Sequence, residues 1–135
     1  MNQLVRHLNT LADRFNVSLE YGPQPEHKAW AYPDTRWNKY MKILASDLVK
    51  EGNSNAYFYA MHEFGHVATT KLERKLERGY ISAMVEGLVS YEVYATELDA
   101  WIWAIQHSII PVTPEMLASM RVGLKTYEYG LVEIG

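Results

Sequence analysis

Residues 55–66 of the chain read NAYFYAMHEFGH. A run that is apolar or aromatic at almost every position is typical of a helix that is buried on all sides. Because residues i and i+4 share one face of a helix, this segment aims the imidazoles of His62 and His66 at a single point. Unpaired polar groups are costly in such surroundings, and a metal ion between the two rings would remove that cost. The segment therefore predicts a buried, metal-binding helix.

The spacing of His62, Glu63 and His66 matches the H-E-x-x-H pattern of zinc metallopeptidases. Zn²⁺ binds imidazole nitrogens at about 2.0–2.1 Å. Glu63 stands one position from His62, beside the metal rather than on it, which is where a general base for a metal-activated water is needed. The alternative left open by these residues is a hydrogen-bonded pair of core histidines without a metal.

Composition limits the class of protein. The chain has 135 residues, of which 48% are hydrophobic and 21% charged, as expected for a single globular domain spanning 1–135. It has no cysteine, so zinc would have to be held by histidine and carboxylate. We find neither a secretory signal nor an apolar run near the ~20 residues of a membrane span, and we expect a cytoplasmic protein without a membrane partner. The net charge of −3 gives no sign of nucleic-acid binding.

The N-terminal half is predicted to contain one helix and a small sheet. Hydrophobic spacing of 3 and 4 predicts a helix over residues 2–15. Alternating residues and turn signals then predict strands over 17–21, 27–32 and 40–45, the second stopped by Pro33.

The C-terminal half is predicted to be helical. The motif helix should run from 55 to near 78, with Asn53 or Ser54 as its N-cap. Helices are also expected over about 81–107 and about 114–128, the latter with Thr113 as N-cap and Pro114 at its first position. The whole order predicts an α+β fold with an N-terminal helix, a small mixed sheet of about three strands, the motif helix and C-terminal helices.

A catalytic zinc also needs a third protein ligand and one open position. Thr69 and Leu72 occupy the places where metzincins carry glycine and histidine, so a carboxylate from a later helix is expected. Glu97 is the favoured candidate, because its helix face is otherwise apolar and a lone carboxylate there is costly unless it binds a cation. Residues on that face are Val93, Tyr94, Ala100, Trp101 and Ala104. Glu86 stays open as the alternative, as does a site that uses neither glutamate.

Other polar residues have weaker functional interpretations. Asp99 could support a ligand histidine, but it points about 160° from Glu97 around the helix, so a solvated side chain is favoured. His27 could stabilise an oxyanion, although an ordinary surface histidine is the simpler interpretation. His107 fits a favourable partner for a helix C-terminus. Tyr94 or Tyr127 could reach a tetrahedral intermediate, and the sequence does not decide between them.

Residues 97–104 read ELDAWIWA and resemble the E-x-[ED]-A-x-x-x-A segment of the ImmA/IrrE-like metallopeptidases, which are minimal gluzincins. The resemblance covers roughly residues 27–105. It implies a zincin-like fold, Glu97 as a zinc ligand, and alanines that let two helices approach closely. It also implies a cytoplasmic protease with a narrow protein substrate, often in phage or mobile-element biology. Trp101 stands where asparagine or aspartate is common in that family. Residues 85–91, which contain Glu86, instead resemble the E-G-[FL]-A-x-Y segment of aminopeptidase-like gluzincins.

The activity predicted from these residues is zinc-dependent hydrolysis of a peptide bond. His62, His66 and Glu97 would hold Zn²⁺, and Glu63 would be the general base for a metal-activated water. The partner would be a protein or peptide substrate, and the oligomeric state stays open. The alternative is a non-catalytic, zinc-stabilised protein-binding module. Glu63 separates the two, because a structural zinc site needs no general base and is usually closed by four protein ligands.

Overall fold

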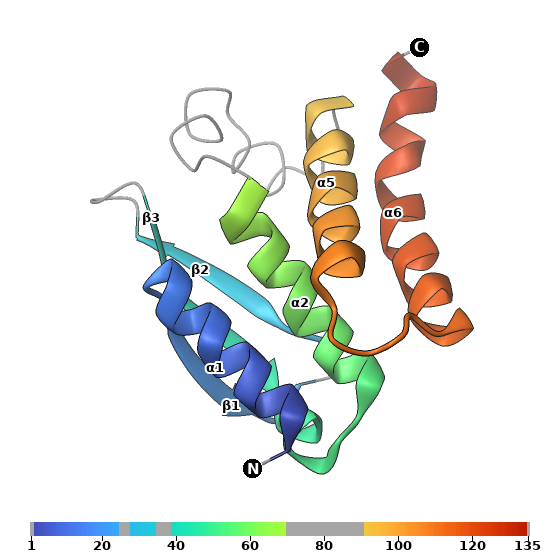
Figure 1. Ribbon diagram of the computed structural model, residues 1–135. Coiled ribbons are helices and arrows are strands. Elements are labelled where there is room, and N and C mark those ends of the chain that lie inside the picture. The colour runs from blue at the N-terminus through green and yellow to red at the C-terminus, as the bar shows by residue number, and fades with distance from the viewer. Residues whose placement is uncertain (1, 25–27, 35–38, 70–90, 135) are drawn as a thin grey trace.

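The computed structural model describes residues 2–24, 28–34, 39–69 and 91–134 (Figure 1). The helices and strands, in chain order, are α1 (Gln3–Phe15), β1 (Ser18–Gly22), β2 (Trp30–Asp34), β3 (Lys39–Ser46), the short 3₁₀ helix η2 (Asp47–Glu51), α2 (Ser54–Thr69), α5 (Tyr91–His107) and α6 (Pro114–Ile134). This is the predicted α+β fold with a small mixed sheet. Three predictions lie outside the described residues: the end of the motif helix near 78, the start of the next helix near 81, and the site of Glu86.

Local capping explains where the long helices begin. The Ala56 N–H donates to Asn53 Oδ1 at 2.9 Å, so Asn53 is the N-cap of α2. The Met116 N–H donates to Thr113 Oγ1 at 3.2 Å, and Pro114 is the first residue of α6. Both helix starts were predicted from the sequence. The predicted end of α6 near 128 was too early, because the helix continues to Ile134.

The sheet has the order β1-β3-β2, with β1 parallel and β2 antiparallel to β3. The predicted strand over 27–32 was placed too early, because β2 runs from Trp30 to Asp34 and includes Pro33. Proline cannot donate a backbone hydrogen bond, but an edge strand tolerates this. β2 occupies that edge position in the described sheet.

A bulge interrupts the pairing of β2 with β3. Tyr32 is opposite Lys42 and the next residue, Pro33, is opposite Tyr40, so Met41 is the extra residue. In a regular strand Tyr40 and Lys42 would point to the same face. The bulge instead turns Tyr40 to the buried face, where it is 8% exposed, and leaves Met41 49% exposed.

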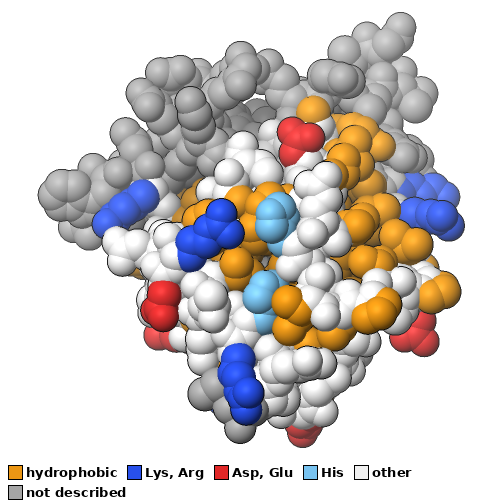
Figure 2. All heavy atoms as spheres, in the orientation of Figure 1, with side chains coloured by type: hydrophobic (Ala, Val, Ile, Leu, Met, Phe, Trp, Pro, Cys, Tyr) orange, Lys and Arg blue, Asp and Glu red, His pale blue; other side chains and the backbone are white. Residues whose placement is uncertain are grey.

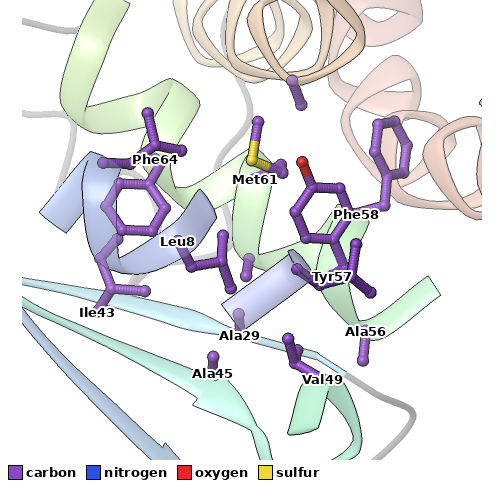
Figure 3. Close-up of a cluster of buried hydrophobic side chains, with 14 of the residues drawn as sticks. Leu8, Ala29, Ile43, Ala45, Val49, Ala56, Tyr57, Phe58, Met61 and Phe64 are labelled. Carbon is purple, nitrogen blue, oxygen red and sulfur yellow. The ribbon is translucent and has the colours of Figure 1, made fainter. Parts of the chain in front are cut away.

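α2 is the central element of the molecule. α1 packs on β1 and α2 on β3 and β2, while α5 packs on α2 and α6 on α5 (Figure 1). The largest fully buried side chains include Tyr57, Phe58, Met61 and Phe64 of α2, and Figure 3 shows them among buried side chains such as Leu8, Ile43 and Val49. The predicted burial of this helix is confirmed, and it places the histidine motif between the sheet side and α5.

The surface adds two observations. Among the described helices, none is long and apolar enough to cross a membrane. On the face drawn in Figure 2, the Lys and Arg side chains of the described residues lie apart from one another rather than in one cluster.

Candidate metal centre

Two histidines of α2 and one glutamate of α5 meet at a single carboxylate oxygen. Glu97 Oε2 lies 2.9 Å from His62 Nε2 and 3.0 Å from His66 Nε2. All three residues are buried, with exposed fractions of 8% for His62, 5% for His66 and 6% for Glu97. Each offers one ligand atom, and these atoms lie within 4.8 Å of one another. The structure therefore brings together the three residues predicted as metal ligands.

The crossing of α2 and α5 explains why the three ligands meet. A Cβ atom built on Gly65 would lie 2.3 Å from the Ala100 carbonyl oxygen and 2.9 Å from its Cα, so the helices approach almost to backbone contact. Gly65 lies between the two histidines, and Ala100 is one turn after Glu97. The absence of a side chain at residue 65 lets the carboxylate reach both imidazoles.

The electrostatics of the site favour a cation. Burial alone would lower the pKa of His62, but hydrogen bonding and the negative charges of the nearby Glu63 and Glu97 raise its pKa to about 9. Burial alone would raise the pKa of Glu97, but hydrogen bonds and positive charge from both histidines hold the pKa of this carboxyl well below its usual range. Positive charge is thus stabilised at the point where the three side chains meet.

The donor set fits zinc. Two imidazole nitrogens and one carboxylate oxygen are a common ligand set of catalytic zinc sites, which keep a further position open. To donate to Glu97, each histidine carries a proton on Nε2, the atom that would bind a metal. His66 Nδ1 is buried without a hydrogen-bond partner among the described residues. A metal on Nε2 would shift the proton to Nδ1, as in metal-bound histidines generally.

Glu63 lies beside these ligands rather than among them. Its Oε1 atom is 3.5 Å from His62 Nδ1, on the side of that ring away from Glu97, and its side chain is 16% exposed. Glu63 is therefore next to His62 and outside the triad, and its place beside a metal stays a prediction. The role of Glu63 as a general base stays a prediction.

Two aromatic residues lie at the site, and the sequence assigned a role to neither. The indole of Trp101 stacks on His62, with ring centroids 3.8 Å apart and planes 5° from parallel. Burial, together with the negative charges of Glu63 and Glu97, raises the pKa of the Tyr40 phenol, which is therefore neutral near the site. Trp101 was placed on the same face as Glu97 from the sequence, but its contact with His62 depends on how two helices cross. The inward position of Tyr40 could not be predicted, because a bulge turns this residue inward.

The remaining candidates are not part of the triad. Asp99 is exposed, as the favoured interpretation expected. His107 is the last residue of α5, and its Nδ1–H donates to the Trp103 carbonyl at 2.9 Å, which fits the predicted place at a helix C-terminus. Tyr94 is partly buried. His27 and the side chain of Tyr127 lie outside the described part of the chain.

No protein-family model matches this chain, and neither does any curated protein or solved structure. The class of molecule is therefore defined by its own fold and site. It is an α+β domain with a buried His-His-Glu triad that is compatible with a metal ion.

Proposed function

We propose that this protein is a zinc-dependent peptidase, in which His62, His66 and Glu97 hold the metal and Glu63 is the general base. The observation that carries the proposal is the meeting of both Nε2 atoms at Glu97 Oε2, with Glu63 adjacent to His62. Three ligands with a carboxylate beside them fit a catalytic zinc site better than a structural one, which is usually closed by four ligands.

Zinc in this position would lower the pKa of a water molecule and polarise the carbonyl of the scissile peptide bond. Glu63 accepts a proton from that water as the water oxygen bonds to the carbonyl carbon. As the C–N bond breaks, Glu63 gives the proton to the departing nitrogen. The acid product keeps the hydroxyl group and the amine product gains the proton, so Glu63 returns to its ionised form.

The resemblance of Glu97, Ala100 and Ala104 to ImmA/IrrE-like metallopeptidases supports a zincin-like fold and a protein substrate. The close approach of Gly65 to Ala100 agrees with the role that the resemblance gives to small residues. We further propose, on the resemblance alone, a cytoplasmic protease of phage or mobile-element biology with a narrow choice of substrate.

The test is a comparison of wild type with Glu63→Gln. Glutamine is nearly isosteric but cannot accept a proton, so cleavage should fall by about 10²–10⁴ while bound zinc and melting temperature stay near wild type. Because the substrate is not known, cleavage is measured across a whole proteome by the appearance of new peptide ends. Asp99→Asn is the matched control, since it makes the same chemical change at an exposed residue of α5.

The competing function is a zinc-stabilised binding module. The burial of all three ligands is the observation that favours it. Equal cleavage by wild type and Glu63→Gln would remove Glu63 from the mechanism. Absence of cleavage by both, with zinc bound and a partner protein retained equally, would establish the binding module in place of the peptidase.

A further inference from the structure

The indole of Trp101 is held firmly against one face of the His62 ring. Its ring centroid is 3.8 Å from that of His62 and the two planes differ by 5°. Phe58 and Tyr59 of α2 also contact Trp101, with centroids at 5.2 and 5.8 Å. A Cβ atom built on Gly123 of α6 would lie 3.7 Å from Trp101 Cζ2. Trp101 is 3% exposed, so it has little room to move.

A ligand histidine needs something to fix the direction of its ring. Usually the nitrogen that does not bind the metal donates to a carboxylate or a carbonyl group. For His62 that nitrogen is Nδ1, and Glu63 Oε1 faces it at 3.5 Å. This is longer than the 2.7–3.2 Å of a well-formed N–H···O hydrogen bond. Under the proposed function Glu63 must also accept and release a proton. A residue with that duty is a poor permanent support for His62.

We propose that Trp101 is the positioning residue of His62, and that stacking on the indole sets the plane of the imidazole so that Nε2 points to the metal position beside Glu97. This inference rests on the proposed metal site. Trp101 follows Glu97 by four residues, so one turn of α5 supplies both a ligand from its own helix and the surface that orients a ligand of α2.

Stacking and hydrogen bonding act differently on a ligand. A carboxylate at Nδ1 fixes the ring and also increases its basicity. An indole face restrains the tilt of the ring but leaves Nδ1 available to Glu63. The arrangement therefore separates two duties, since Trp101 orients His62 while Glu63 is free to move a proton.

The experiment measures zinc affinity of metal-free protein by competition with a chromophoric chelator. Trp101→Leu removes the stack and should weaken zinc binding by about 10- to 100-fold, as loss of a supporting partner usually does. Trp101→Phe keeps an aromatic face and should restore most of the affinity. If only the bulk of residue 101 mattered, the loss of zinc affinity would follow side-chain volume, and Trp101→Phe would lie midway between wild type and Trp101→Leu rather than close to wild type.

Trp103 provides the matched control. It lies on the same helix, is 9% exposed, and stacks on His107 with centroids 4.3 Å apart and planes 16° from parallel, so its imidazole partner is not a ligand. Trp103→Leu should leave zinc affinity unchanged. Equal losses in Trp101→Leu and Trp103→Leu, or equal losses in Trp101→Leu and Trp101→Phe, would overturn the proposal.

A measurement on the wild type remains decisive if the leucine variants do not fold. In metal-free protein, NMR signals of the His62 ring protons should be shifted upfield by the indole. Those of His7 should shift less, since its aromatic neighbour Tyr57 is tilted by 47° at 5.9 Å. Ordinary shifts for His62 would refute the stack. Upfield shifts without any zinc binding would refute the metal centre and leave the stack standing.

Discussion

At the residue scale, the central feature is the sharing of Glu97 Oε2 by two buried imidazoles. Neither histidine has to move far to bind a metal, because both Nε2 atoms already face one point. His62, His66 and Glu97 were all predicted from the sequence. The histidines follow from i, i+4 spacing, and Glu97 follows from the cost of a lone carboxylate on an apolar helix face.

Glu97→Ala should remove most of the zinc affinity. In metal-free protein it should also lower the free energy of unfolding by about 3–5 kcal/mol, since it removes the buried carboxylate that both imidazoles share. Zinc content after dialysis and urea unfolding measure the two effects. Asp99→Ala is the control, because that carboxylate is exposed. If Glu86→Ala releases the metal and Glu97→Ala does not, the third ligand has been assigned wrongly.

The stability of metal-free protein should depend on pH through the same residues. The pKa of His62 rises from 6.5 to about 9 on folding, so its contribution is fully present below pH 6.5 and is lost as pH rises through 9. The pKa of Glu97 falls below 4.5 on folding, so its contribution is present above pH 4.5 and is lost as pH falls through its low folded pKa. We expect the melting temperature of chelator-treated protein to be highest between pH 4.5 and pH 6.5, and to fall from pH 6.5 to 9. If the melting temperature of Glu97→Gln depends on pH in the same way as that of the wild type, the expectation is wrong.

At the element scale, the geometry of the site depends on how closely α2 and α5 cross at Gly65 and Ala100. The starts of α2 and α6 could be predicted because Asn53 and Thr113 cap them through local hydrogen bonds. The bulge at Met41 could not, because it arises from the pairing of two strands rather than from residues near it in sequence.

Gly65→Ala should disrupt both the fold and the metal site. The new Cβ would lie 2.3 Å from a backbone oxygen that cannot rotate away, so α2 and α5 must separate. We expect a loss of at least about 1–3 kcal/mol in unfolding free energy, as for overpacked cores, and weaker zinc binding. Thermal unfolding and chelator competition measure these.

Gly123→Ala is the control for that change. It is also a helical glycine, but its new Cβ would lie 3.7 Å from Trp101 Cζ2, an ordinary contact. Alanine in a helix is favoured over glycine by about 0.5–1 kcal/mol, so this variant should be neutral or more stable. Equal behaviour of the two variants would show that the close crossing is not the cause.

At the scale of the whole molecule, the site lies where α2, which packs on the sheet, meets α5, which packs on α6 (Figure 1). The α+β order could be predicted from the succession of helix and strand patterns along the chain, and the burial of α2 from the apolar run in residues 55–61. The sheet order β1-β3-β2 could not, since strand pairing depends on contacts distant in sequence.

Zinc should stabilise the molecule by joining α2, which packs on the sheet, to α5, which packs on α6. At a free zinc concentration 100 times the Kd, the unfolding free energy should increase by about 2.7 kcal/mol. Removing zinc should increase amide hydrogen exchange more in α5 and α6 than in α1 and the sheet, because the proposed ligands join α5 to α2, whereas backbone hydrogen bonds between strands hold the sheet without a metal. Elemental analysis should find about one zinc per chain. Exchange that increases equally everywhere, or no stabilisation by zinc, would contradict this arrangement.

The near-contact of Gly65 with Ala100 also limits how the site could be altered by selection. Because main-chain atoms set the gap between the ligand-bearing helices, side-chain changes nearby can alter how strongly a metal is held but cannot widen the gap. Acceptance of a larger ion would require the two helices to slide or tilt. Directed evolution towards such an ion should therefore accumulate substitutions at residues 65 and 100 while the three ligands stay unchanged.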